Sequence, residues 1–131
     1  MASTMEKWLN HTFSSGSKTG QDYAAFQRVA RADLRKQAKA AGYALHEFNP
    51  NHYEFSAVLR DEITGKFVYI AISDVRYSRN EWYTCVLYRT MAHDKDWTDS
   101  SNQYCCWPEI PQVLKRMRMR RYGRYERQDS C

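Results

Sequence analysis

The sequence predicts an α+β fold, in which a four-stranded antiparallel meander is covered by an N-terminal amphipathic helix and a shorter C-terminal helix. Three observations support this. Residues 22–41 have the apolar period of a helix, residues 43–89 hold four strand-like segments separated by short turns, and residues 109–119 return to the helical period. The order of one helix, four strands and one helix is typical of two layers, in which the helices cover one face of the sheet.

The first helix is expected from Asp22 to Ala41. Thr19 or Asp22 can cap its N-terminus, and Gly42 stands where a glycine often follows a helix. A helix turns by about 100° per residue, which makes one side of this segment apolar and the other basic. The apolar side carries Tyr23, Phe26, Ala30, Leu34, Gln37 and Ala41, and the basic side carries Arg28, Arg31, Arg35 and Lys39. The basic side is either a binding surface or a solvated face.

Four strands are expected next. They cover residues 43–48, 52–60, 66–73 and 81–89, and the turns between them contain Asn49-Pro50-Asn51, Thr64-Gly65 and Ser78-Arg79-Asn80. The second strand alternates apolar and polar residues, which is typical of a half-buried strand. The third is apolar on both sides and is expected at the centre of the sheet. A long polar connection, 90–107, then leads to the last helix, which places Ile110, Val113, Leu114 and Met117 on one face.

The length of 131 residues fits one domain, and the hydrophobic content of 43% excludes a fully disordered chain. We expect a flexible N-terminal segment at 1–20, because residues 12–20 are small and polar. The residues before this linker, including Trp8 and Leu9, are either a short docking segment or frayed. A single α+β domain follows at 21–119, and residues 120–131 form a basic tail. The apolar runs fall far short of the roughly 20 residues that span a bilayer, so we expect a cytoplasmic protein without membrane contact.

Positive charge is concentrated at the C-terminus. The net charge of +5 arises entirely after residue 113, where seven basic residues face two acidic ones, whereas residues 1–113 contain thirteen of each sign. A neutral body with a basic end suggests an anionic partner, although a basic tail can also serve solubility alone.

Catalytic and metal-binding patterns are weak. The four cysteines lack zinc-site spacing and are expected to be free thiols in a reducing compartment. Residues 93–99 hold a histidine and three aspartates, but without the glycine and terminal glutamate of a calcium loop. A thiolate pair of Cys85 or Cys105 with His93 is conceivable, but no recognisable family sequence surrounds it. We therefore expect no enzyme, no cofactor, no metal and no small-molecule substrate.

Binding of nucleic acid or of an acidic partner has more support. Between residues 116 and 125 arginines alternate with tyrosines, and arginine contacts phosphates while tyrosine can stack on unpaired bases. The same composition could also contact an acidic protein groove. The candidate binding residues are Arg28, Arg31, Arg35, Lys39, Lys115, Arg116, Arg118, Arg120, Arg121, Tyr122, Arg124 and Tyr125.

Three blocks of sequence between about residues 50 and 104 resemble a known group of proteins. They are Gly65 to Arg76 with Asn80-Glu81-Trp82-Tyr83, then Leu87-Tyr88-Arg89-Thr90, then His93-Asp94-Lys95-Asp96-Trp97-Thr98. They resemble small proteins encoded on bacterial plasmids, prophages and integrative elements, which include candidate anti-CRISPR proteins. The resemblance implies a bacterial host cell and a class of function, the blocking of an RNA-guided effector. It implies no catalytic residues.

A second resemblance is one of topology. The order of elements is similar to that of a double-stranded RNA-binding domain. A helix and a strand are followed by Asn49-Pro50-Asn51-His52, a second strand, Thr64-Gly65-Lys66 and a third strand. In that family, a Gly-Pro-x-His loop joins the first two strands. Asn49 replaces that glycine here. A fourth strand precedes the last helix, and the Lys-Lys-x-Ala-Lys start of that family's last helix is missing.

The expected function is a non-enzymatic anti-defence protein of a mobile element, which inhibits a bacterial RNA-guided nuclease by binding the effector complex or its RNA or DNA. Such effectors hold their nucleic acid in positively charged channels, so a basic protein is a poor mimic of DNA there. Contact with exposed guide RNA, target DNA or an acidic protein surface is expected instead. The alternative is a nucleic-acid-binding accessory protein of a mobile element.

Overall fold

The computed structural model describes residues 4–11, 21–50, 55–72, 81–91 and 102–118. Its helical segments are η1 (Thr4–Trp8), α1 (Gln21–Ala40), α2 (Glu81–Thr84), η2 (Trp107–Glu109) and α3 (Ile110–Arg118). Its strands are β1 (Tyr43–Asn49), β2 (Phe55–Asp61), β3 (Phe67–Ile72), β4 (Val86–Met91) and β5 (Gln103–Cys105). The predicted α+β class is confirmed.

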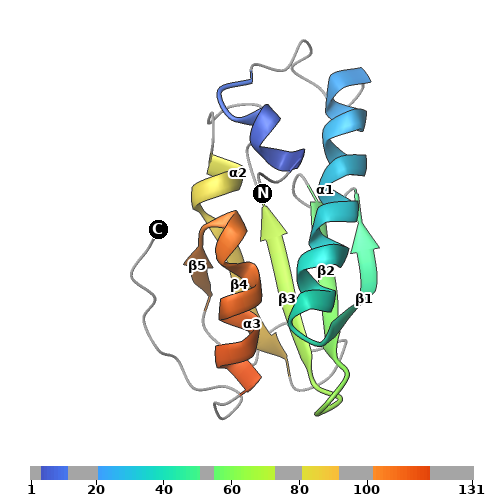
Figure 1. The fold of residues 1–131 in the computed structure, drawn as a ribbon, viewed down its shortest axis with the longest axis vertical. Coiled ribbons are helices and arrows are strands. Elements are labelled where there is room, and N and C mark those ends of the chain that lie inside the picture. The colour runs from blue at the N-terminus through green and yellow to red at the C-terminus, as the bar shows by residue number, and fades with distance from the viewer. Residues whose placement is uncertain (1–3, 12–20, 51–54, 73–80, 92–101, 119–131) are drawn as a thin grey trace.

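The strands form one antiparallel sheet in chain order, β1-β2-β3-β4-β5. The long helix α1 and the shorter α3 pack next to each other on one face of this sheet, α1 over β1 and β2 and α3 over β4 and β5 (Figure 1). Their C-terminal ends lie at the same end of the molecule. The predicted two-layer arrangement is therefore present, with one strand more than expected.

The number of strands and the extent of the fourth strand were predicted wrongly. Residues 81–84 form the helical turn α2, and β4 begins only at Val86. In α2 the Trp82 ring packs edge-on against Phe26 and Trp107, at centroid distances of 5.3 and 6.1 Å. The fifth strand, β5, lies within the stretch that we expected to be a polar connection. Its three residues are too few for a visible alternation of apolar and polar side chains.

The helix α1 agrees with its predicted amphipathic pattern. Its buried residues are Tyr23, Phe26, Ala30, Leu34 and Ala38. Gln37, which was placed on the apolar side, is only half-buried and donates a hydrogen bond to the Asp33 carboxylate at 3.1 Å. Gly42 follows the helix with a φ of +83°, a left-handed conformation that glycine adopts without strain.

The helix-covered face of the sheet carries the main core. Phe55 of β2 is fully buried and touches the rings of Phe26, Phe48 and Trp107. A second buried cluster of Val58, Tyr69, Ala71 and Met91 lies on the opposite face. The register of β2 with β3 accounts for both, because Leu59 pairs with Val68 while Val58 pairs with Tyr69, and neighbouring residues of a strand point to opposite faces.

The N-terminal segment expected to be flexible contains a docked element. Met5 and Trp8 of η1 are buried, and the Trp8 ring packs edge-on against Phe26 at 5.7 Å. The Trp8 ring also packs edge-on against the His11 ring, at a centroid distance of 4.9 Å. The His11 Nε2 lies 3.1 Å from the Asp22 carboxylate at the start of α1. Residues 12–20, the predicted linker, lie outside the described residues.

The cysteines only partly follow the expectation of free thiols. Cys85 and Cys105 are free, but Cys106 is disulfide-bonded. Pairing could not be inferred from four cysteines without a spacing motif.

Candidate functional site

The exposed side of α1 carries the largest group of cationic residues that the structure describes on one element. Arg28, Arg31, Arg35 and Lys39, the four residues predicted from the helical period, are all exposed. Lys36, which was not among the predicted binding residues, is exposed on the same helix and completes the set. We call these five residues the α1 basic face.

The acidic residues of α1 do not neutralise the α1 basic face, because both are engaged elsewhere. The Asp22 carboxylate accepts a hydrogen bond from the Tyr23 backbone N–H at 2.9 Å and lies against His11. The Asp33 carboxylate accepts a 2.6 Å hydrogen bond from the Trp107 indole N–H. Within the described parts of the chain, no ion pair involves a residue of the α1 basic face.

The α1 basic face has an energetic cost. Arg31 and Lys39 each lie four residues from Arg35, and like charges at this spacing destabilise a helix by about 0.2–0.5 kcal/mol per pair. The helix dipole favours cations only in the last turn, so it accounts for Lys39 but not for Arg28 or Arg31. Arg31 has one internal contact, because its guanidinium lies over the Phe48 ring at 5.4 Å. The rest of the positive charge is free to meet an external anion.

On α3, the three predicted site residues have different environments. Lys115 is exposed, whereas Arg116 is partly buried, with its Nε lacking a hydrogen-bond partner. Arg118 is the last described residue of the chain and turns inward. The remaining predicted residues, Arg120, Arg121, Tyr122, Arg124 and Tyr125, lie outside the described residues.

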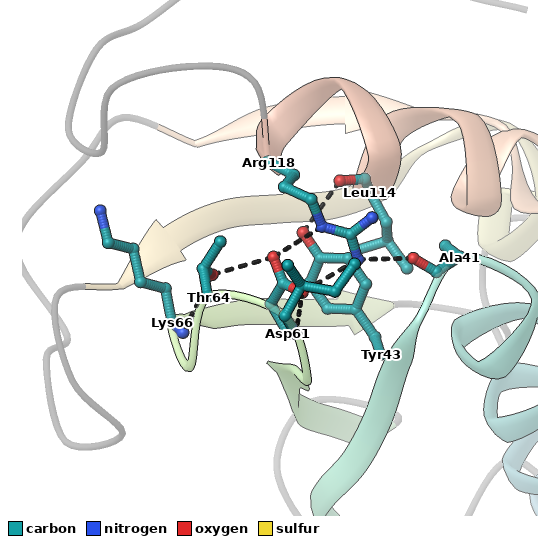
Figure 2. A network of polar contacts seen from close by, with 8 residues as sticks. Ala41, Tyr43, Asp61, Thr64, Lys66, Leu114 and Arg118 are labelled. Atoms are coloured by element: carbon teal, nitrogen blue, oxygen red, sulfur yellow. Dashed lines mark hydrogen bonds and ion pairs between the residues drawn. The ribbon is translucent and has the colours of Figure 1, made fainter.

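Arg118 forms a buried ion pair with Asp61 (Figure 2). Its Nε donates to one oxygen of the Asp61 carboxylate and its Nη2 to the other, both at 2.9 Å. The same Nη2 donates to the Ala41 carbonyl at 2.6 Å, and the guanidinium carbon lies 5.1 Å from the centre of the Tyr43 ring. The Tyr43 hydroxyl in turn donates to the Leu114 carbonyl at 2.9 Å. This network ties α3 to the end of α1 and to the sheet.

Asp61 also shapes the turn between β2 and β3. Its carboxylate accepts hydrogen bonds from the Ile63 N–H at 3.0 Å and from the Thr64 hydroxyl at 2.9 Å. Burial of this carboxyl raises its pKa, but the bonds from Arg118, Ile63 and Thr64 outweigh that effect and hold the pKa below its usual value. Asp61 is therefore ionised at neutral pH and neutralises Arg118 inside the fold.

Arg118 is thus a structural residue whose charge is already compensated. We grouped Arg118 with the other C-terminal arginines because the sequence around it gives no sign of a partner. That partner, Asp61, lies 57 positions away in the chain. No local pattern reveals such a pair. The network nevertheless has a positional consequence, since it fixes the point at which the chain enters residues 119–131 beside the C-terminus of α1.

The described residues offer little for catalysis. Burial, with a smaller effect from the Glu109 charge, raises the pKa of the Cys105 thiol to about 12, so this thiol is not a nucleophile at neutral pH. No group of three or more histidine, cysteine, aspartate or glutamate residues that could hold a metal occurs in the part of the chain that the structure covers. His93 and the 93–99 carboxylates lie outside it.

Comparison with known proteins adds no assignment. No protein-family profile, no curated protein and no solved structure matches this chain. Among the described helices, none is both long and apolar enough to cross a membrane.

Proposed function

We propose that this chain is a non-enzymatic binding protein whose partner is a nucleic acid, contacted by the α1 basic face and by the basic residues that follow Arg118. The observation that carries the proposal is the set of exposed cations on α1 that has no ion pair within the described structure. A set of like charges that costs stability and lacks an internal partner supports an external anion.

The arrangement of the charges favours nucleic acid over an acidic protein surface. Arg28 and Lys39 are eleven residues apart, which corresponds to about 16 Å along a helix axis. A phosphate backbone presents negative charges at regular short intervals over such a distance. Arginine is also the cation that binds phosphate with two parallel hydrogen bonds, and it supplies three of the five charges.

The biological setting that we propose is inhibition of a bacterial RNA-guided nuclease. Its support is the resemblance of residues 50–104 to proteins of mobile elements. In this setting the α1 basic face would contact exposed guide RNA or target DNA, and the protein would act as a ligand of the loaded complex. The same surface would serve a nucleic-acid-binding accessory protein of a mobile element, so the two settings differ in the partner complex and not in the contact.

Support for a non-enzymatic protein comes from the state of two reactive groups among the described residues. The Cys105 thiol is protonated and buried, and the Asp61 carboxylate is buried in an ion pair with Arg118. Neither group is available for nucleophilic or acid–base chemistry.

Salt-dependent binding tests the proposal. Fluorescence anisotropy of labelled RNA and DNA is measured with the full chain and with a chain that lacks residues 120–131. The tail has four arginines, and four phosphate contacts would contribute about −3 to the slope of log affinity against log salt, so the truncation should flatten the slope by roughly 2 to 3 if most of them engage. The apolar positions of α3 end at Met117, so we expect the truncated chain to fold. Because the deletion also removes Cys131, urea unfolding of the truncated chain is compared with that of the full chain before the salt slopes are compared.

Three outcomes would contradict parts of this proposal. Absence of binding to RNA and DNA, together with binding to an acidic polypeptide, would assign the cations to a protein partner. Binding to free nucleic acid but not to a loaded RNA-guided nuclease would remove the inhibitor setting and leave the accessory protein. An unchanged salt slope after truncation would limit the contact to the α1 basic face.

A further inference from the structure

The exposed side of α1 has an unusually restricted composition. From Ala24 to Ala40, every exposed residue is an alanine, an arginine or a lysine. The alanines are Ala24, Ala32 and Ala40, and the other five residues are the α1 basic face. The side chains of Gln27, Asp33 and Gln37 are half-buried and are engaged in intramolecular hydrogen bonds. Gln27 donates to the Pro50 carbonyl, Gln37 donates to the Asp33 carboxylate, and Asp33 also accepts from Trp107. The surface thus lacks aromatic rings, amides and carboxylates.

This composition limits what the surface can recognise. Proteins that bind single strands use aromatic side chains on which unpaired bases stack. Proteins that read base edges use amides and carboxylates as well as arginine, because adenine and cytosine need such partners. The arginines and lysines of this surface could contact guanine edges, but the surface has no exposed group for adenine or cytosine and no aromatic ring of its own for stacking. A row of cations separated by alanine is best suited to lie along a phosphate backbone.

The rigidity of α1 points to the same class of ligand. Five side chains of the helix are buried against the sheet, and Arg118 binds the carbonyl just beyond its end. The spacing of the cations along the helix is therefore fixed. A duplex also has fixed phosphate positions, so the two rigid arrays can meet without ordering a flexible strand.

We infer that the α1 basic face binds the sugar-phosphate backbone of a double-stranded nucleic acid, independently of its base sequence. This inference rests on the proposed function and narrows the ligand of α1 to duplex backbone. The tyrosines that could stack on unpaired bases, Tyr122 and Tyr125, belong to the tail and not to this surface.

A charge-reversal pair tests the inference. Arg35→Glu changes the centre of the α1 basic face. Arg60→Glu is the matched control, because Arg60 is also exposed but lies in β2 on the sheet face opposite to Leu59 and the helices. Each variant changes the net charge by the same amount. Anisotropy titrations with the full chain use duplex DNA and duplex RNA, each in two unrelated sequences, and the corresponding single strands.

The expected result is specific to Arg35. Arg35→Glu should weaken duplex binding by about tenfold and lower the salt slope by about 1, equally for both sequences. Arg60→Glu should change duplex affinity by less than about threefold, and both variants should affect single strands alike. The DNA and RNA arms show which duplex is the ligand. Arg35→Glu should fold as well as the parent, because Arg35 is exposed and loses two like-charge neighbours.

Three results would overturn the inference while leaving the proposed function intact. They are equal losses for Arg35→Glu and Arg60→Glu on duplex, a loss for Arg35→Glu that is as large on single strands as on duplex, and a loss that depends on the duplex sequence. Failure of the parent chain to bind any of the probes would instead overturn the proposed function. Arg28→Glu, seven residues or about two turns nearer the N-terminus on the same face, repeats the test at a second position.

Discussion

Replacing Arg118 by alanine would remove the side chain that joins α3, the end of α1 and the turn after β2. In the parent protein its guanidinium donates two hydrogen bonds to Asp61 and one to the Ala41 carbonyl. The Asp61 side chain is completely buried, and that of Arg118 is 19% exposed. After the substitution, a buried carboxylate would keep only the Ile63 and Thr64 hydrogen bonds and would have no positive partner.

The cost of this change follows from the burial of Asp61. Removing one partner of a buried ion pair typically costs 3–5 kcal/mol, because the remaining charge is left without compensation. Since Arg118 is partly exposed and water can replace some of its contacts, we expect the lower end, about 3 kcal/mol. For a domain of this size that corresponds to a fall of roughly 10 °C in Tm.

Urea unfolding and thermal melting at pH 7 measure the effect. Lys115→Ala, which truncates an exposed cation in the same helix, is the matched control and should change stability by less than about 0.5 kcal/mol. The pH dependence gives a second check. The low pKa of Asp61 means that the parent is stabilised by the pair above the usual carboxyl pKa and loses this contribution as the pH falls below about 5.

In the alanine variant, burial without Arg118 would raise the pKa of Asp61. Lowering the pH would then protonate the carboxylate and remove its uncompensated charge. The difference in stability between parent and variant should therefore be largest at neutral pH and narrow as the pH falls. A loss similar to that of Lys115→Ala, or a difference that grows in acid, would refute the assignment of Arg118 as the partner of a buried carboxylate.

Two further predictions concern the core and the thiols. Phe55→Ala removes a fully buried ring that touches Phe26, Phe48 and Trp107. The free energy of unfolding, measured in urea, should fall by about 3–5 kcal/mol. A Tm within a few degrees of the parent would show that this ring does not pack in the core. Cys85 is exposed and should react with a thiol reagent at pH 8 in the folded protein, whereas Cys105, with its pKa raised to about 12, should react only after unfolding. Mass spectrometry of the labelled peptides distinguishes them, and labelling of Cys105 in the folded state would contradict its burial.

Local sequence patterns were sufficient for the elements with a long, regular period. The helix α1 shows four apolar positions, Tyr23, Phe26, Ala30 and Leu34, that recur at three or four residues, and all four are buried. The α+β class and the antiparallel order followed from such periods and from short turns. The exposed cations of α1 followed as well, because they are the opposite side of the same helix.

Tertiary structure decided the features that depend on partners distant in the chain. Trp82 lies in a segment rich in β-forming residues, but its contacts with Phe26 and Trp107 hold it in a helical turn. The strand β5 is too short for a period and exists through its pairing with β4. The sequence left open whether Trp8 docks on the domain or frays, and burial against Phe26 makes it part of the core.

The candidate site shows the same division. By itself the sequence determined which residues are cationic and which helix presents them in a row, because charge and helical period are local properties. It grouped Arg118 with the other basic residues near the C-terminus, since nothing near it in the chain indicates a partner. Only the folded chain brings Asp61 to Arg118, and a guanidinium held by a buried carboxylate supports the fold, whereas the exposed arginines of α1 remain available to a phosphate.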